Sequence, residues 1–93
     1  MEAVMEIKVQ KLSQDELKKM GVFGWPVWEK EASRFPWVYD SIEECYFLEG
    51  DVTVEAKDGK KVTFGKGDFV TFPKGLSCAW NIKQPVRKHY NFK

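Results

Sequence analysis

Two charged residues lie in strand-like stretches where alternation would turn them inward, and together they could act as an acid and a base. Glu43 shares its phase with Cys45 and Phe47, because strand side chains return to the same face at every second residue. Lys88 is in phase with the apolar residues of its own stretch, which are Val86, Tyr90 and Phe92. A buried charge needs a partner, so we expect Glu43 and Lys88 to pair. An internal ion pair is the favoured interpretation, and an acid–base pair at the base of a pocket is the alternative.

The two cysteines, Cys45 and Cys78, fall in the same inward phase. Cys78 alternates with Trp80 and Ile82, which is the pattern of a buried strand face. A buried free cysteine acts mostly as a small hydrophobe, whereas a nucleophilic one needs a base within hydrogen-bond reach. His89, the single histidine, is out of phase with the apolar face of its strand, so we expect it to point outward and form no dyad with a thiol. An oxidation-sensitive thiol pair across the interior is the open alternative to two free cysteines.

Aromatic residues make up 15% of the sequence, a heavy load for a small domain. We expect most of them to fill the core or to cover the mouth of a barrel. Trp37 or Trp80 could instead stack against a flat ligand. The residues concerned are Trp25, Trp28, Trp37, Tyr39, Tyr46 and Trp80.

Length and charge limit the classes of function. A chain of 93 residues makes a single domain, residues 1–93, near the small end of what folds alone. Its 15 basic and 14 acidic residues create no field that would favour nucleic acid or an anionic membrane. No apolar stretch approaches the roughly 20 residues needed to span a bilayer. The acidic start, Met1 to Glu6, is unlike a signal peptide, so we expect a cytoplasmic protein with free thiols.

The elements that would position these residues are mainly short strands. Residues 5–12 alternate like a half-buried strand, and Ser13 with Glu16 forms a capping box for a short helix that Gly21 ends. Residues 25–39, interrupted by two prolines, are expected to be loop-rich with one short strand.

Beyond this segment, Asp58-Gly59 predicts a hairpin. The other strands are expected at 44–49, 52–56, 61–64, 68–72, 76–82 and 86–92, with turns at 49–51 and 65–67. Many short, evenly spaced strands predict an all-β sandwich or barrel.

The spacing of several residues resembles the two motifs of the cupin β-barrel. Glu43-x6-Gly50 matches the end of the first motif, G-x5-H-x-H-x3,4-E-x6-G. Gly67-x5-Pro73-x-Gly75 matches the start of the second, G-x5-P-x-G-x2-H-x3-N. Beyond Gly24 nearly the whole chain is similar to small single-domain cupins of the ureidoglycine-aminohydrolase and ethanolamine-utilisation type. The resemblance implies a jelly-roll barrel with one short N-terminal helix.

The histidines that bind a metal in this family have no counterpart here. With a three-residue gap before Glu43 their positions fall on Trp37 and Tyr39, and with a four-residue gap on Pro36 and Val38. Cys78 stands at the position of the third histidine. Because a catalytic transition metal usually takes three or more protein donors, we expect no cofactor. A weak divalent metal at Glu43 and Cys78 is the alternative.

Three functional classes follow from this combination. The first is a metal-free pocket that binds a small molecule through Trp37, Tyr39, Glu43, Cys45, Cys78, Trp80 and Lys88. The second, by resemblance, is an enzyme acting on a small nitrogenous or sugar-like metabolite through Glu43, Lys88 and Cys78. The third is an interaction protein that uses the barrel as a scaffold. The resemblance to small cupins, which commonly dimerise, implies a homodimer, and the exposed alternation at residues 5–12 would suit strand exchange at an edge.

Overall fold

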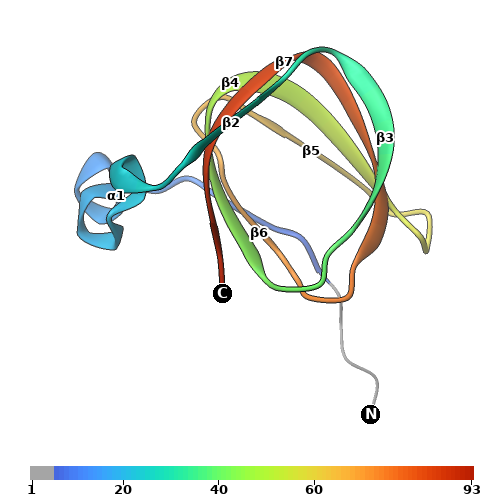
Figure 1. Ribbon diagram of the computed structural model, residues 1–93, viewed down its shortest axis with the longest axis horizontal. Helices are drawn as coiled ribbons and strands as arrows, with labels where there is room; N and C mark the ends of the chain where they lie inside the picture. Colours follow the sequence, from blue (N-terminus) through green and yellow to red (C-terminus); the bar gives the residue numbers. More distant parts are fainter. Residues whose placement is uncertain (1–5) are drawn as a thin grey trace.

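Two long strands organise the fold in the computed structural model, which describes residues 6–93. The strands β4 (Glu43–Ala56) and β7 (Ser77–Phe92) pair antiparallel along most of their length. Shorter strands flank them: β1 (Lys8–Gln10), β2 (Val27–Lys30), β3 (Ser33–Val38), β5 (Lys61–Gly65) and β6 (Phe69–Phe72). Viewed down the shortest axis, the strands curl around a common interior (Figure 1). The prediction of an all-β fold is confirmed.

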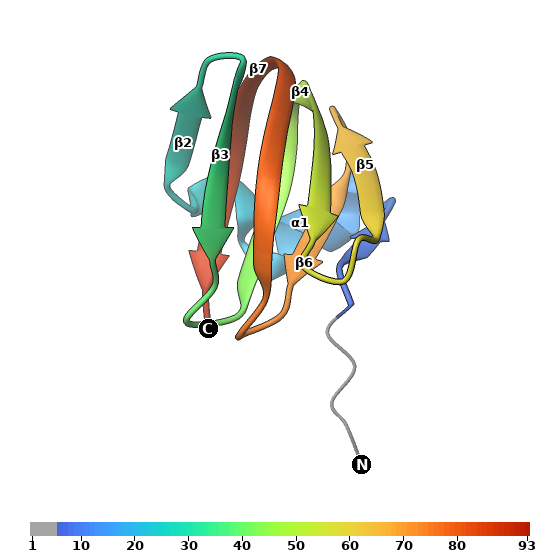
Figure 2. The same cartoon turned by 90° about the vertical axis from the view of Figure 1, so that its right-hand side faces the viewer.

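Each long strand contributes to both halves of the sheet. The start of β4 pairs with β6 and its end with β5, while the start of β7 pairs with β3 and its end with β2. Figure 2 shows β3, β7 and β4 side by side. One path through the sheet runs β1-β6-β4-β7-β2, and its two end strands are not paired with each other in the described part of the chain. The sheet therefore curls into an open barrel and does not close.

Both long strands bend at residues that the sequence marked as breaks. The register between β4 and β7 shifts repeatedly from Phe47 to Val52. Gly50 lies in this stretch with φ of 136°, and a Cβ atom there would lie 2.9 Å from Cγ2 of Val86. The prediction of a turn at residues 49–51 is wrong. These residues belong to the bent strand β4, which pairs with β7 on both sides of the bend. The strands expected at 76–82 and 86–92 are likewise one strand, with Pro85 near its bend.

The segment 25–39 contains two strands where one was expected. The strand β2 follows Pro26, and β3 contains Pro36 opposite Ala79 of β7. Proline is tolerated in an edge strand, where its missing N–H removes no ladder hydrogen bond. The pairing found for β3 is with β7 on one side, so Pro36 does not interrupt the sheet.

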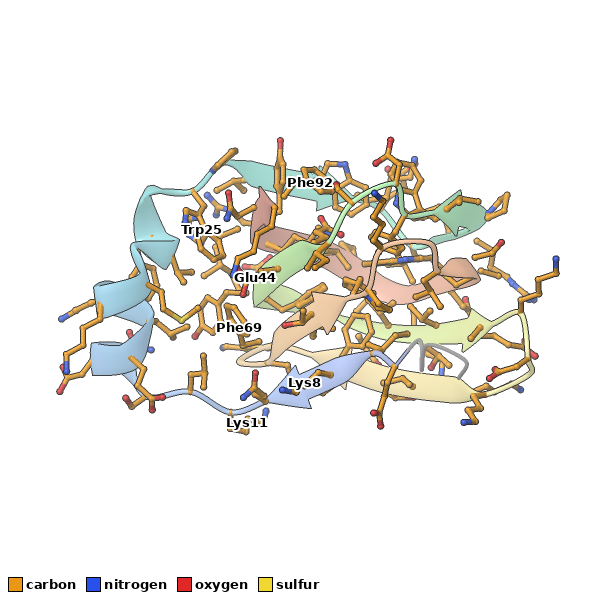
Figure 3. All side chains as sticks on the ribbon, turned by 90° about the horizontal axis from the view of Figure 1, so that it is seen from below. Lys8, Lys11, Trp25, Glu44, Phe69 and Phe92 are labelled. Atoms are coloured by element: carbon orange, nitrogen blue, oxygen red, sulfur yellow. The ribbon has the colours of Figure 1, made fainter. Side chains whose placement is uncertain are left out.

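The helical segment packs against the outside of the sheet. In α1 (Gln14–Met20) Ser13 and Glu16 form the expected capping box, and Gly21 ends the helix in the left-handed conformation with φ of 77°. A 3₁₀ turn, η1 (Val22–Gly24), follows it. Trp25 and Phe69 lie between this segment and the sheet (Figure 3). The strand expected at 5–12 is shorter, as β1, and all three of its residues are in exposed positions; Met5 lies outside the described residues.

The interior of the barrel holds one continuous apolar core. The inward phases expected for Cys45 with Phe47, and for Cys78 with Trp80 and Ile82, are confirmed by burial. The buried members of this core are Tyr39, Cys45, Phe47, Val52, Val54, Phe64, Val70, Phe72, Leu76, Cys78, Trp80, Ile82 and Val86. Within residues 6–93 no helix is long and apolar enough to cross a membrane.

Candidate ligand-binding site

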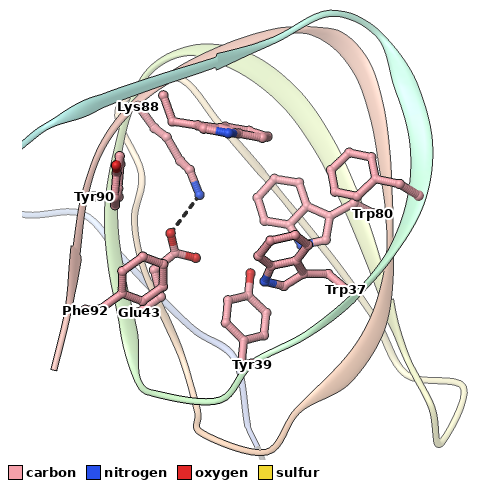
Figure 4. Close-up of a pocket in the computed structure, with 9 residues that line it drawn as sticks. Trp37, Tyr39, Glu43, Trp80, Lys88, Tyr90 and Phe92 are labelled. Carbon is pink, nitrogen blue, oxygen red and sulfur yellow. Dashed lines mark hydrogen bonds and ion pairs between the residues drawn. The ribbon is translucent and has the colours of Figure 1, made fainter.

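A pocket of about 230 Å³ opens from the barrel interior to the surface, and most of its wall is aromatic (Figure 4). Trp37 and Phe92 are about half exposed, at 47% and 49%, and mark its mouth. Glu43 and Lys88 are the charged residues of the lining. The complete lining consists of Trp28, Phe35, Trp37, Tyr39, Glu43, Trp80, Lys88, Tyr90 and Phe92.

The inner end of the pocket is formed by a buried ion pair. Nζ of Lys88 lies 3.0 Å from Oε2 of Glu43, and each side chain is only 6% exposed. Lys88 stands opposite Phe47 in the β4–β7 register, and Glu43 lies four residues earlier on the same face of β4. The long lysine side chain spans this offset. The pairing expected from the alternation of both strands is confirmed.

The ammonium group of Lys88 is enclosed by aromatic rings as well as by the carboxylate. Nζ lies 4.9 Å from the ring centroid of Trp28, 5.0 Å from that of Trp80 and 5.9 Å from that of Phe47. It also donates a hydrogen bond of 3.3 Å to Sγ of Cys45. Because ring faces attract cations most strongly where water is excluded, this enclosure offsets part of the desolvation of the lysine.

Tyr39 and Trp80 bring two uncharged polar groups to the same pocket (Figure 4). Burial, and after it the negative charge of Glu43, raises the pKa of Tyr39 far above its usual range, so the hydroxyl keeps its proton and can donate. Among residues 6–93, Nε1 of Trp80 is the one buried side-chain nitrogen or oxygen without a hydrogen-bond partner. Its approach to the hydroxyl of Tyr39 opposes part of the rise in the pKa of Tyr39, and the nitrogen itself is enclosed by protein atoms.

The sequence placed Cys45 and Cys78 in this site, but neither lines the pocket. Cys45 is fully buried behind Lys88, and burial raises the pKa of its thiol well above the usual range, with the Lys88 charge opposing that rise. Sγ of Cys78 donates to the backbone carbonyl of Trp37 at 3.6 Å, and burial raises the pKa of Cys78 to about 11. Both cysteines are free. They support the wall of the pocket from behind.

Four lining residues were not predicted: Trp28, Phe35, Tyr90 and Phe92. Tyr90 and Phe92 share the phase of Lys88 in the sequence, so alternation alone could have identified them. Trp28 pairs directly with Lys88 in the β2–β7 register. It was missed because the segment containing Trp28 and Phe35 was expected to be loop-rich.

His89 occupies the opposite face of β7 from Lys88, as its phase indicated, but it is not solvent-exposed. It is 9% exposed, and its Nδ1 lies 2.9 Å from the backbone carbonyl of Trp25. Its ring meets Phe23 edge-on at 5.9 Å. The histidine points away from the barrel interior, as expected, and the helical segment covers this face of the sheet. The histidine joins that segment to the barrel.

Comparison with known proteins agrees with this arrangement. The family model for the EutQ-like cupin domain matches residues 17–90, which is most of the chain. The chain belongs to the EutQ-like cupin domain family. The jelly-roll cupin fold expected from the motif spacing is thereby confirmed, with the sheet left open.

Solved structures support the same assignment. A DUF861 family protein from Thermotoga maritima is 55% identical over 95% of this cupin domain and 100% of its own chain, with a TM-score of 0.93. Another DUF861 family protein, from Pseudomonas syringae, is 26% identical over 72% of this chain and 29% of its own, with a TM-score of 0.65. The EutQ protein of Clostridium difficile shares the fold at 24% identity, over 71% of this chain and 52% of its own, with a TM-score of 0.65. No curated protein matches.

The donor atoms of this cupin domain do not suit a resident transition metal. Of the motif's ligand positions, the carboxylate of Glu43 remains, and it is bonded to the ammonium group of Lys88. Within residues 6–93 no three His, Cys, Asp or Glu side chains lie close enough together to hold a metal ion. A site for zinc or a similar ion normally provides three or four such donors. The cation that this site does hold is Lys88 itself.

Proposed function

We propose that this cupin domain binds a small, flat, uncharged molecule in its aromatic pocket without the help of a metal ion. The observation that carries this proposal is the buried Lys88–Glu43 pair, 3.0 Å apart, at the inner end of a pocket with aromatic walls. Ligand sites are typically apolar clefts with a few converging polar groups, which is the composition of this pocket.

The size of the pocket points to a ligand smaller than most drugs. At about 230 Å³ it lies below the common range of about 300–1,000 Å³ for sites that hold drug-sized molecules. Phe35 and Trp80 stack on each other at 15°, with ring centroids 5.9 Å apart, and the half-exposed indole of Trp37 at the mouth offers an aromatic surface on which a planar group can stack. A single aromatic ring or a short conjugated chain fits this space.

The charge of the pocket favours a polar but neutral ligand. Glu43 and Lys88 neutralise each other, so a ligand with a net charge would bring an uncompensated charge into a site of low dielectric. The hydrogen-bonding groups suit a carbonyl or an amide. Lys88 and the hydroxyl of Tyr39 can donate, and the carboxylate of Glu43 can accept.

A matched ligand series tests the proposal by thermal shift in the presence of EDTA. Benzamide and benzyl alcohol should raise Tm, whereas benzoate and benzylamine, which differ mainly in charge, should raise it less. Trp37→Ala should weaken benzamide binding, because it removes the aromatic surface at the mouth. Val38→Ala is the matched control, since Val38 is 66% exposed and does not line the pocket. Binding that requires a divalent ion, or no shift with any compound, would overturn the proposal.

A further inference from the structure

We propose that Lys88 is a reactive amine that captures small conjugated aldehydes as an imine, with Glu43 moving the proton. This inference rests on the proposed function, because it assigns a covalent step to the same pocket and narrows the ligand class to carbonyl compounds. Four features of the structure support it: the position of the amine in the pocket, its distance from a carboxylate, the aromatic rings around it and the neutral Tyr39 hydroxyl in the same pocket.

The amine is placed where a bound carbonyl carbon would meet it. Lys88 and Glu43 both line the pocket, although their side chains are only 6% exposed. A ligand that fills the pocket therefore reaches Nζ while bulk water is largely kept away. Exclusion of water matters because imines hydrolyse readily in bulk solution. Lysines along the outer surface, such as Lys83 on the same strand, lack this shelter.

Glu43 is within direct proton-transfer distance of the nucleophile. An ammonium group has no lone pair, so Nζ must first give up a proton, and Oε2 of Glu43 lies 3.0 Å away to accept it. The nitrogen lone pair then forms a bond to the carbonyl carbon, and the carbonyl oxygen takes the proton back from Glu43. A second proton, from the nitrogen, allows that oxygen to leave as water while the C=N bond forms. One ammonium and one aldehyde thus give one protonated imine and one water, with no oxidant or reductant.

The same surroundings stabilise the product. A protonated imine is a cation, and the ring faces of Trp28 and Trp80 at 4.9 and 5.0 Å from Nζ remain beside it. The carboxylate of Glu43, again ionised, becomes its counter-ion. The hydroxyl of Tyr39 is a neutral donor on the pocket side, and the departing oxygen would accept a hydrogen bond from it.

Reductive trapping with benzaldehyde tests the inference. The wild-type protein is mixed with a small excess of benzaldehyde and sodium cyanoborohydride near neutral pH, and the modified lysines are mapped by mass spectrometry. We expect the peptide that contains Lys88 to gain the mass of the aldehyde less one oxygen atom, and to do so at least 10-fold faster than the peptide that contains Lys83. Benzamide, which cannot form an imine, should slow the labelling of Lys88 and leave that of Lys83 unchanged.

Variants of Lys83 and Glu43 distinguish imine formation at Lys88 from simple binding of a ligand in the pocket. Lys83→Arg should leave the labelling of Lys88 unchanged, and Glu43→Gln should slow it by roughly 100-fold, the lower end of the usual contribution of a general acid–base group. If Glu43→Gln does not fold, the relative labelling rates of Lys88 and Lys83 in the wild-type protein still test the inference. Labelling of Lys88 no faster than of Lys83, together with stabilisation by benzamide, would refute the imine and leave the binding function standing. Failure of both benzamide and benzaldehyde to bind would refute both proposals.

Discussion

The Lys88–Glu43 pair allows a stability experiment whose outcome depends on burial. Replacement of Lys88 by Met removes a cation that is 6% exposed and leaves the buried carboxylate of Glu43 unpaired in a pocket with mainly aromatic walls. Breaking a buried pair in this way destabilises proteins by about 3–5 kcal/mol, because the remaining charge is uncompensated. For a domain of this size, each kcal/mol lowers Tm by roughly 4–8 °C. We therefore expect Lys88→Met to lower Tm by roughly 12 °C or more.

The matching double variant isolates the cause. Glu43→Met/Lys88→Met loses the same ion pair but leaves no unpaired charge, and such apolar replacements are often neutral or stabilising. It should therefore be more stable than Lys88→Met alone. An exposed pair provides the control: Nε of Arg87 lies 3.3 Å from Oε1 of Glu29, with side chains 52% and 67% exposed. Arg87→Met should change the free energy of unfolding by less than about 1 kcal/mol.

Urea unfolding followed by tryptophan fluorescence measures all four proteins. Two results would refute the reasoning. One is a loss in Lys88→Met no larger than that in Arg87→Met, which would mean that solvent reaches the pair. The other is a double variant less stable than Lys88→Met, which would mean that the pair itself, and not the stranded charge, carries the stability.

Four further predictions concern other parts of the molecule. Gly50→Ala should destabilise the fold by about 1–3 kcal/mol by urea unfolding, because φ is 136° and the new Cβ would meet Val86, whereas Gly24→Ala, with open space around it, should have a smaller effect. Between pH 9.0 and about 11 the unfolded chain loses the Cys78 proton that the folded protein keeps, so stability should fall with pH, and Cys78→Ala should flatten that slope in urea titrations at several pH values. Elemental analysis of the purified protein should find less than about one tenth of an equivalent of Mn, Fe, Ni or Zn, and full occupancy by any of them would contradict the metal-free proposal. Gel filtration with light scattering should give a dimer mass, and a monomer at all concentrations would refute the proposed edge pairing.

Alternation allowed much of the site to be predicted because it is a local property of strands. The inward orientation of Glu43 and Lys88 follows from the two-residue period of a strand, and their contact at 3.0 Å agrees with the resulting prediction. The capping box at Ser13 and the stop at Gly21 are also local signals, and both are confirmed. The spacing from Glu43 to Gly50 and from Gly67 to Gly75 was informative for the fold.

The wrong or incomplete predictions concern residues whose structural effect depends on which strand or helix packs beside them. Glycine and proline mark turns when nothing pairs beside them, but Gly50 bends a strand that β7 pairs with on both sides of the bend. Pro36 lies in an edge strand, where a proline does not interrupt the ladder. His89 faces away from the core, yet η1 and Trp25 pack against it, and strand periodicity cannot predict a helical segment packed from outside. The alternation also placed the cysteines inside correctly, but could not tell the lining of a pocket from the layer behind it.

Lys88 changes what the retained glutamate can do. In the motif that the chain resembles, the carboxylate would share a metal ion with histidines, and the metal would bring Lewis acidity to a bound oxygen. Here the same carboxylate holds a primary amine, enclosed by Trp28 and Trp80. A lysine cation provides positive charge, as a metal does, but in addition it can lose a proton and become a nucleophile. Chemistry at this site is therefore expected to pass through the nitrogen of Lys88 and to depend on proton transfer to Glu43.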